Sequence, residues 1–197
     1  MMSNFFSFIQ MFFLQLRIAV CFKRKFGKLG KNVKFGRINR IRGGEHIEIG
    51  DNCSFGNNLR LEAVVRYGGG VFSPLLVFGN NVVINQNFHC TCASEIKIGE
   101  GTSITANCGV FDIIHPYEDI ALNPRLAPIQ TKPVIIGRDC IIGMNSVILP
   151  GTQLGNHCVV GANSTVSGIF PDNCVIVGSP AKVVKQFDLN SKTWIKV

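Results

Sequence analysis

Aliphatic residues recur at every sixth position in the second half of the chain. These residues are Ile136, Ile142, Ile148, Leu154, Val160 and Val166, and the small residues four positions after the first five are Cys140, Ser146, Thr152, Cys158 and Ser164. An α-helix would spread such a repeat around its axis, and a flat strand would alternate with a period of two. The strict period of six instead predicts a coil with flat faces. The aliphatic side chain fills its interior, and the small one fits the narrower corner.

Glycine directly follows four of these aliphatic residues, as Gly137, Gly143, Gly155 and Gly161. We expect these glycines to supply permissive backbone at the bends, and stacked coils to pair as parallel strands about 4.8 Å apart. With this repeat the sequence resembles the hexapeptide-repeat transferases, acyltransferases built as a left-handed parallel β-helix. The resemblance extends from Leu29 to Lys185, and it implies an all-β fold, a left-handed coil and a homotrimer.

The repeat is interrupted twice before its end. It loosens at residues 67–70, Tyr-Gly-Gly-Gly, where we expect a turn or bulge, and it is lost over residues 111–133, which hold four prolines. A long aperiodic insertion in a regular solenoid is expected to protrude, and such loops usually carry function. Residues 181–187 are expected to form a short helix that covers the open edge of the last coil. The β-helix domain therefore covers residues 29–187, and residues 188–197 form a tail.

The first 28 residues differ from the rest. Their apolar residues form one broad stripe at helical spacing: Phe5, Phe6, Phe8, Ile9, Phe12, Phe13, Leu16 and Val20. This pattern predicts an amphipathic helix, which Gln10, Gln15 and Arg17 make a poor transmembrane span. Two interpretations stay open: the helix lies in a membrane interface, or its stripe packs on the base of the β-helix or on a neighbouring subunit.

Charge is concentrated in the same region. With 46% hydrophobic and 16% charged residues in 197, the composition indicates one folded domain. The net charge is +8, but ten of the 20 Lys and Arg residues lie in residues 1–44, which hold no acidic residue. No helix-turn-helix, zinc-finger or RNP-type motif accompanies this basic segment, so nucleic acid is not an expected partner. An anionic membrane surface is favoured, and peripheral association through residues 1–28 is expected.

The eight cysteines indicate small buried residues rather than disulfides or a metal centre. Five of them occupy the small inward position of a repeat: Cys53, Cys108, Cys140, Cys158 and Cys174. Free thiols in this number fit a reducing compartment, so a cytoplasmic location, at the inner face of the membrane, is expected. The four histidines, His46, His89, His115 and His157, lack the spacing of the β-helical carbonic anhydrases. No metal is expected.

One histidine is the main candidate for catalysis. The sequence lacks a Gly-x-Ser-x-Gly elbow, a P-loop and a dinucleotide fingerprint. His115 precedes Pro116 and lies sixteen residues after Gly99. In the sugar and antibiotic O-acetyltransferases that the chain resembles, a His-Pro at this place carries the general base, and imidazole can accept a proton near neutral pH.

The resemblance also implies an acceptor site. Asn85, fourteen residues before Gly99, matches an Asn that holds the acceptor in galactoside-acetyltransferase-like members, and Asp112 is a further acceptor-binding candidate. Asn is also a common turn residue. Those members carry an acidic residue where this chain has Ala93, so the acceptor is expected to differ from theirs.

The donor site implied by the resemblance lies in the C-terminal repeats. In the family, the pantetheine arm of acetyl-CoA runs between adjacent β-helices of a trimer, along backbone that matches Gly143, Met144 and Ala162. The N–H of Met144 would lie near the thioester, where an oxyanion needs a donor. Residues 177–185, VGSPAKVVK, resemble the terminal signature in which basic residues, here Lys182 and Lys185, contact the CoA phosphates. Many members have Thr-Lys before the final turn, where this chain has Ser167-Gly168, so one phosphate contact is expected to be lost.

These features predict an acetyl-CoA-dependent O-acetyltransferase that acts on a sugar hydroxyl in surface polysaccharide or lipid-linked glycan biosynthesis. Two alternatives within enzymes stay open, N-acetylation of a nucleotide-linked amino sugar and O-acetylation of serine. From another class, a non-catalytic β-helical scaffold subunit remains an alternative.

Overall fold

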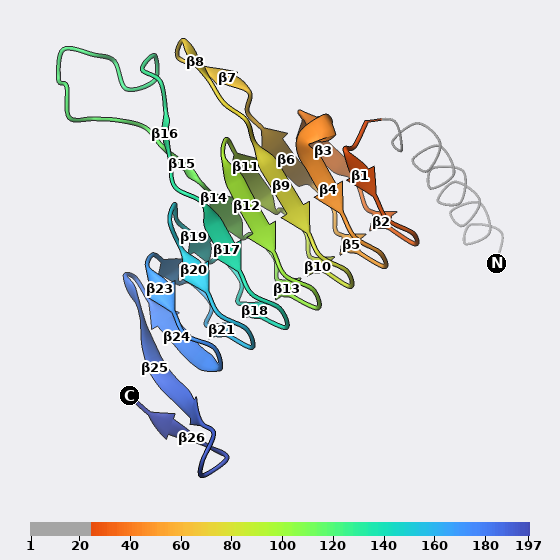
Figure 1. Ribbon diagram of the computed structural model, residues 1–197, viewed down its shortest axis with the longest axis vertical. Helices are drawn as coiled ribbons and strands as arrows, with labels where there is room; N and C mark the ends of the chain where they lie inside the picture. Colours follow the sequence, from red (N-terminus) through yellow and green to blue (C-terminus); the bar gives the residue numbers. More distant parts are fainter. Residues whose placement is uncertain (1–24) are drawn as a thin grey trace, which may run out of the picture.

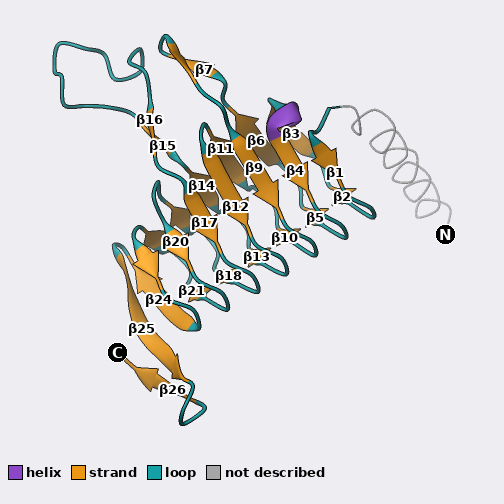
Figure 2. Cartoon of the chain, viewed as in Figure 1, coloured by secondary structure: helices purple, strands orange, loops and turns teal. Residues whose placement is uncertain are grey.

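The structure, a computed structural model, describes residues 25–197, so the predicted N-terminal helix lies outside the described residues. Within this range the chain winds through three sheets of short, mostly parallel strands, one strand of each sheet per coil (Figure 1). Strands and turns make up nearly the whole described chain, and one short 3₁₀-helix, η1 (Gly44–His46), precedes the second coil (Figure 2). The fold is therefore a parallel β-helix, as the period of six predicts.

The three sheets follow one another around each turn of the coil. Sheet A contains β1 (Lys28–Leu29), β4 (Ile47–Ile49), β9 (Leu75–Phe78), β12 (Glu95–Ile98), β17 (Val134–Ile136), β20 (Gln153–Leu154) and β23 (Ile169–Phe170). Sheet B contains β2 (Lys34–Phe35), β5 (Ser54–Phe55), β10 (Val83–Ile84), β13 (Ser103–Ile104), β18 (Ile141–Ile142), β21 (Val159–Val160), β24 (Cys174–Gly178), β25 (Ala181–Asp188) and β26 (Thr193–Lys196). Sheet C contains β3 (Ile38–Arg42), β6 (Leu59–Ala63), β11 (His89–Cys92), β14 (Gly109–Phe111), β19 (Val147–Ile148) and β22 (Thr165–Val166).

The interior contains the residues that the repeat assigns to it. The six aliphatic residues of the C-terminal repeats are at most 3% exposed, and the five small residues that follow them are at most 1% exposed. Burial of this continuous aliphatic column is the main favourable term in folding. The five cysteines predicted at small inward positions are buried and free.

The glycines after the aliphatic residues have a different role from the predicted one. None of the four has a positive φ; the left-handed backbone at each corner belongs to a residue two positions later, such as Asn145 (φ 61°) or Asn163 (φ 58°). A Cβ atom on Gly143 would lie 2.5 Å from the main-chain nitrogen of Ala162 in the next coil. Glycine is needed because successive coils approach closely, not because the bend requires special backbone angles.

Asparagines connect successive coils at the corner between sheets B and C. Asn87, Asn107, Asn145 and Asn163 all have left-handed backbone, which Asn tolerates better than most residues. Each side-chain Nδ2 donates to the Oδ1 of the next, at 2.7, 2.9 and 3.0 Å. The ladder fixes the stacking of the coils along this edge.

The end of the chain forms strands, and the prediction of a short helix over residues 181–187 is wrong. β25 pairs antiparallel with β24, and β26 pairs antiparallel with β25. The tail over residues 188–197 thus belongs to the same sheet. β25 contains the β-branched pair Val183 and Val184, which favours a strand, and the free edge of β24 offers it hydrogen bonds. The aromatic rings of Phe187 and Trp194 pack edge to face at 5.5 Å.

Both interruptions of the repeat project from the same corner, where sheet C leads into sheet A (Figure 1). The first is a hairpin of β7 (Arg66–Tyr67) and β8 (Gly70–Val71), which confirms the predicted turn. The second, in residues 111–133, begins and ends with the antiparallel pair β15 (Ile113–Ile114) and β16 (Gln130–Thr131) and protrudes as predicted. Among residues 25–197, no helix has the length and apolar character needed to cross a membrane.

Candidate active site

His115 lies where β15 ends and the protruding loop begins. Its Nδ1 lies 3.4 Å from the carbonyl oxygen of Pro124, across the loop. A carbonyl can only accept a hydrogen bond, so this contact favours a proton on Nδ1 and leaves the lone pair on Nε2. The ring also packs edge to face on Tyr67 at 5.3 Å, and the Tyr67 hydroxyl donates to the carbonyl of Arg125 at 2.7 Å. The hairpin and the loop together hold the imidazole.

This imidazole lines a pocket of about 420 Å³ on the outer face of sheet C. At the His115 end the walls are mostly apolar: Val64, Tyr67, Ile113 and Ile129. The rest of the pocket is formed by Arg40, Arg42, Arg60, Glu62, His89, Thr91 and Phe111. The size and the division into apolar and polar ends suit a small organic ligand.

Asp112 does not face this pocket. Its side chain is fully buried, and its carboxylate accepts hydrogen bonds from the main-chain N–H groups of Ala93 and Ser94, at 2.7 to 3.1 Å, and from the Ser94 hydroxyl. An acceptor has no access to this carboxylate, which corrects the prediction that Asp112 binds it. Asp112 instead fixes the base of the loop to the preceding coil, at the position where Ala93 replaces the family's acidic residue.

The predicted acceptor and donor residues share another edge. Asn85, after β10, lies at the corner between sheets B and C, in line with Gly143 after β18 and two coils away from it. Met144, which is 48% exposed, directly follows Gly143. Ala162 occupies the same position in the next coil. The structure therefore brings Asn85, Gly143, Met144 and Ala162 to one edge, and His115 lies at the opposite end of sheet C.

Two main-chain donors at this edge are available to a ligand. Within the described residues, the N–H groups of Met144 and Ala162 make no hydrogen bond. At the corner between sheets A and B, the equivalent N–H of Arg138 is bonded by the Asn156 side chain of the next coil, at 3.0 Å. Met144 is followed one coil later by Ala162, which has no side-chain acceptor. The N–H of Met144 therefore remains free to donate to an oxyanion.

The predicted phosphate-binding residues are divided between edges. Lys182 and Lys185 are exposed on β25, and Lys182 lies near the end of the strand that adjoins the edge of Met144. Ser167 is also exposed, but it follows β22 at the corner between sheets C and A. The structure brings Lys182 toward Gly143 and Ala162, and it does not bring Ser167 there.

A polar cluster in the pocket was not found from the sequence. Glu62 is 7% exposed and pairs with Arg60 (Nη2–Oε2, 2.6 Å) and Arg40 (Nε–Oε1, 3.2 Å). His89 contacts Thr91 at 3.1 Å, and burial, followed by the charge of Arg60, lowers the pKa of His89. The available signal was the alternation of outward polar residues with buried ones, as in Arg60-Leu61-Glu62. These segments are far apart in sequence, and only the stacking of coils brings them together.

No group of three or more His, Cys, Asp or Glu side chains in residues 25–197 could hold a metal ion. The thiols of Cys90 and Cys92 are also poor nucleophiles, since burial raises the pKa of both well above the usual value. The described residues of the site offer histidines, free main-chain N–H groups and charged side chains.

Comparisons with known proteins agree with this fold. Residues 133–168 match the family model described as bacterial transferase hexapeptide (six repeats). The putative lipopolysaccharide biosynthesis O-acetyl transferase WbbJ of Escherichia coli is 36% identical over 163 residues, which cover 79% of this chain and 80% of WbbJ. The chain is thus an acyltransferase with a left-handed β-helix. It belongs to the hexapeptide-repeat acetyltransferase family.

Solved structures show the same fold. A mutant of AntD, an N-acyltransferase from Bacillus cereus in complex with dTDP-4-amino-4,6-dideoxyglucose and coenzyme A, superposes with a TM-score of 0.68 at 21% identity, covering 85% of this chain and 87% of AntD. The acetyltransferase VCA0836 of Vibrio cholerae, complexed with acetyl coenzyme A, has a TM-score of 0.57 at 22% identity, with coverages of 91% and 86%. At these identities the likeness concerns the fold alone.

Proposed function

We propose that the protein transfers an acetyl group from acetyl-CoA to a sugar hydroxyl in the synthesis of a surface polysaccharide or lipid-linked glycan. The observation that carries the proposal is His115, whose Nδ1 faces the carbonyl of Pro124 at the apolar end of an open pocket. This contact leaves Nε2 as a base directed at a bound hydroxyl. The name of the WbbJ relative, an O-acetyl transferase of lipopolysaccharide biosynthesis, supports the acceptor class.

In the proposed reaction, Nε2 of His115 takes the proton of the acceptor hydroxyl as the oxygen attacks the thioester carbonyl. The N–H of Met144 stabilises the tetrahedral oxyanion. The carbon–sulfur bond then breaks, and the thiolate of CoA takes the proton from the imidazolium. No covalent enzyme intermediate is needed. Gly143 and Ala162 line the path of the pantetheine arm, and Lys182 and Lys185 meet the phosphates, without Ser167, which lies at another corner.

The same reaction requires more than one chain. His115 and the edge with Asn85, Met144 and Ala162 lie at opposite ends of sheet C in one chain, so a second chain has to bring them together. The protruding loop carries apolar residues that a neighbour would cover: Tyr117, Ile120, Leu122 and Leu126 are 56 to 99% exposed. In the proposed homotrimer, residues 29–187 form the catalytic β-helix, and residues 1–28 hold it at the inner face of the membrane.

CoA release from acetyl-CoA, measured with a panel of sugar acceptors, tests the proposal. His115→Ala is expected to lower the rate by about 10² or more, the scale of a lost general base. His157→Asn is the matched control, because His157 is exposed, has left-handed backbone (φ 53°) that Asn tolerates, and is remote from the pocket.

Equal rates for the wild type and His115→Ala would remove the histidine from the mechanism. Transfer to amino sugars or to serine, with none to sugar hydroxyls, would replace the proposed acceptor by one of the two alternatives. Absence of acetyl-CoA binding would contradict the proposal as a whole and favour the scaffold.

A further inference from the structure

Three arginines gather on the outer face of sheet C, at the end of the pocket away from His115. β3, β6, β11 and β14 stack side by side, so that Arg40 lies opposite Arg60, which lies opposite His89. In the next row, Arg42 lies opposite Glu62. The cluster of Arg40, Arg42 and Arg60 therefore forms one continuous surface with the pocket wall.

The charges of this cluster do not balance. Glu62 is occupied by Arg60 and Arg40, and its side chain is only 10% exposed. The Arg42 side chain is exposed and makes no ion pair or hydrogen bond within the described residues. His89 adds no negative charge, so three guanidinium groups face one carboxylate in the pocket.

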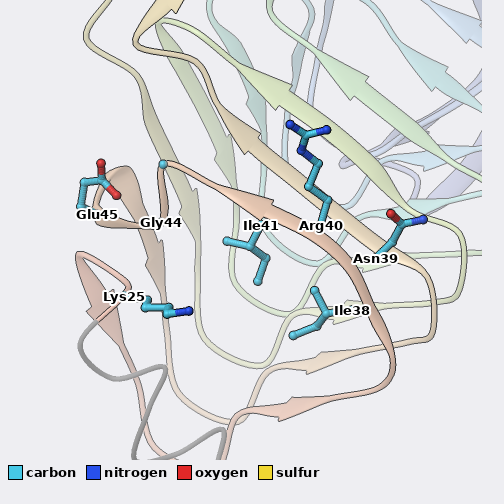
Figure 3. A pocket seen from close by; sticks show the side chains of 8 residues that line it. Lys25, Ile38, Asn39, Arg40, Ile41, Gly44 and Glu45 are labelled. Atoms are coloured by element: carbon cyan, nitrogen blue, oxygen red, sulfur yellow. The ribbon is translucent and has the colours of Figure 1, made fainter.

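Stability does not account for this arrangement. Arg40 and Arg60 lie directly opposite each other on neighbouring strands. Like charges in this position destabilise a sheet. The ion pairs of Glu62 involve Arg60 and Arg40 only, so they leave the Arg42 side chain without a carboxylate partner among the described residues. Figure 3 shows the Arg40 side chain directed away from Ile38 and Ile41, with which it lines a neighbouring hollow, and the side chain is 54% exposed.

The position of the cluster relative to His115 suggests its ligand. The strands of Arg42 and Phe111 are separated by three strand spacings, roughly 14 Å in all, and β15 with His115 continues from the strand of Phe111. A ligand with its sugar at the apolar end near His115 would place its next group over the arginines. Guanidinium groups bind phosphate oxygens in a bidentate way.

We propose that Arg42, together with Arg40 and Arg60, binds the diphosphate of an acceptor in which the sugar is carried on a diphosphate ester. The excess of two positive charges suits such a group. This inference rests on the proposed function, because it assigns the substrate class of the same pocket. The diphosphate can come from a nucleotide-linked sugar or from a prenyl-linked sugar, and both share the recognised chemistry.

Calorimetric titration with inorganic pyrophosphate tests the proposal, in the presence of saturating CoA so that Lys182 and Lys185 are occupied. Arg42→Gln is expected to weaken pyrophosphate binding about tenfold or more, and Arg42→Lys, which keeps the charge but not the fork of donors, by less. Arg37→Gln is the matched control, because Arg37 is exposed on the first coil but does not line the pocket. CoA binding is measured separately and is expected to be the same in all variants.

Equal pyrophosphate binding by the wild type and Arg42→Gln, or no binding by the wild type, would overturn the proposal. Absence of CoA binding by the wild type would instead contradict the proposed function. Failure of the diphosphate proposal and failure of the proposed function are therefore distinguishable. Stronger competition with pyrophosphate by UDP than by geranyl diphosphate would identify the nucleotide-linked source. The reverse order would identify the prenyl-linked source. Competition by glucuronate but by neither diphosphate would replace the diphosphate by a carboxylate and overturn the proposal.

Discussion

His89 and His115 line the same pocket but have different surroundings. His115 is exposed and contacts a carbonyl oxygen and the Tyr67 ring. His89 lies between Arg60, Glu62, Thr91 and the Phe111 ring, which is 5.1 Å away. Burial and Arg60 lower the pKa of His89 below 6.5, and Glu62 opposes this only in part. These surroundings support the proposed role of His115 as the base, and the lowered pKa of His89 favours its neutral form.

The lowered pKa of His89 predicts a pH dependence of stability. Because the unfolded chain binds a proton more readily than the folded one, the free energy of unfolding is expected to fall as the pH drops through about 6.5. His89→Gln removes this group, so the difference between urea midpoints at about pH 7.5 and pH 5.5 should become smaller than in the wild type. An unchanged difference would show that His89 titrates equally in both states.

Loss of the Asp112 carboxylate is expected to destabilise the base of the protruding loop. Asp112→Asn places an amide donor against the N–H groups of Ala93 and Ser94, and is expected to lower the free energy of unfolding by about 2 kcal/mol, the scale of a lost charged hydrogen bond. Hydrogen exchange at these two amides should become faster. Glu118→Gln, on the exposed part of the same loop, is the control and should change neither quantity; equal exchange in Asp112→Asn would contradict the role.

Among the elements, the turn after β18 allows the proposed oxyanion donor to be tested by itself. Met144 precedes Asn145 (φ 61°) as Pro150 precedes Gly151 (φ 82°) at the corner between sheets C and A. Proline is thus compatible with this place in a corner turn. Met144→Pro removes the N–H together with the side chain and is expected to lower kcat by about 10² to 10³, whereas Met144→Ala removes the side chain and keeps the N–H. A similar loss of activity in both variants would assign the effect to the side chain instead.

The comparison of elements also explains which features the sequence predicts. Each coil position recurs, so six aliphatic residues located the core, and the loss of period located the loop with His115. β25 belongs to no repeat, and its strand character depends on the free edge of β24, which only the folded chain supplies. Coil stacking places Arg42 opposite Glu62 on the neighbouring strand, and the hydrogen bond between Asp112 and Ala93 likewise joins residues 19 positions apart. Such contacts have no local signal.

At the scale of the whole molecule, the separation of His115 from Met144 within one chain leads to a complementation experiment. His115→Ala and Met144→Pro are each expected to be inactive alone. In a cyclic trimer each site combines His115 of one chain with Met144 of the next, so chains mixed by co-expression regain about a quarter of the wild-type sites. CoA release by the mixture, compared with the two variants mixed after separate assembly, measures this recovery. If one chain held the whole site, no mixed assembly would contain an intact one, and activity would not return.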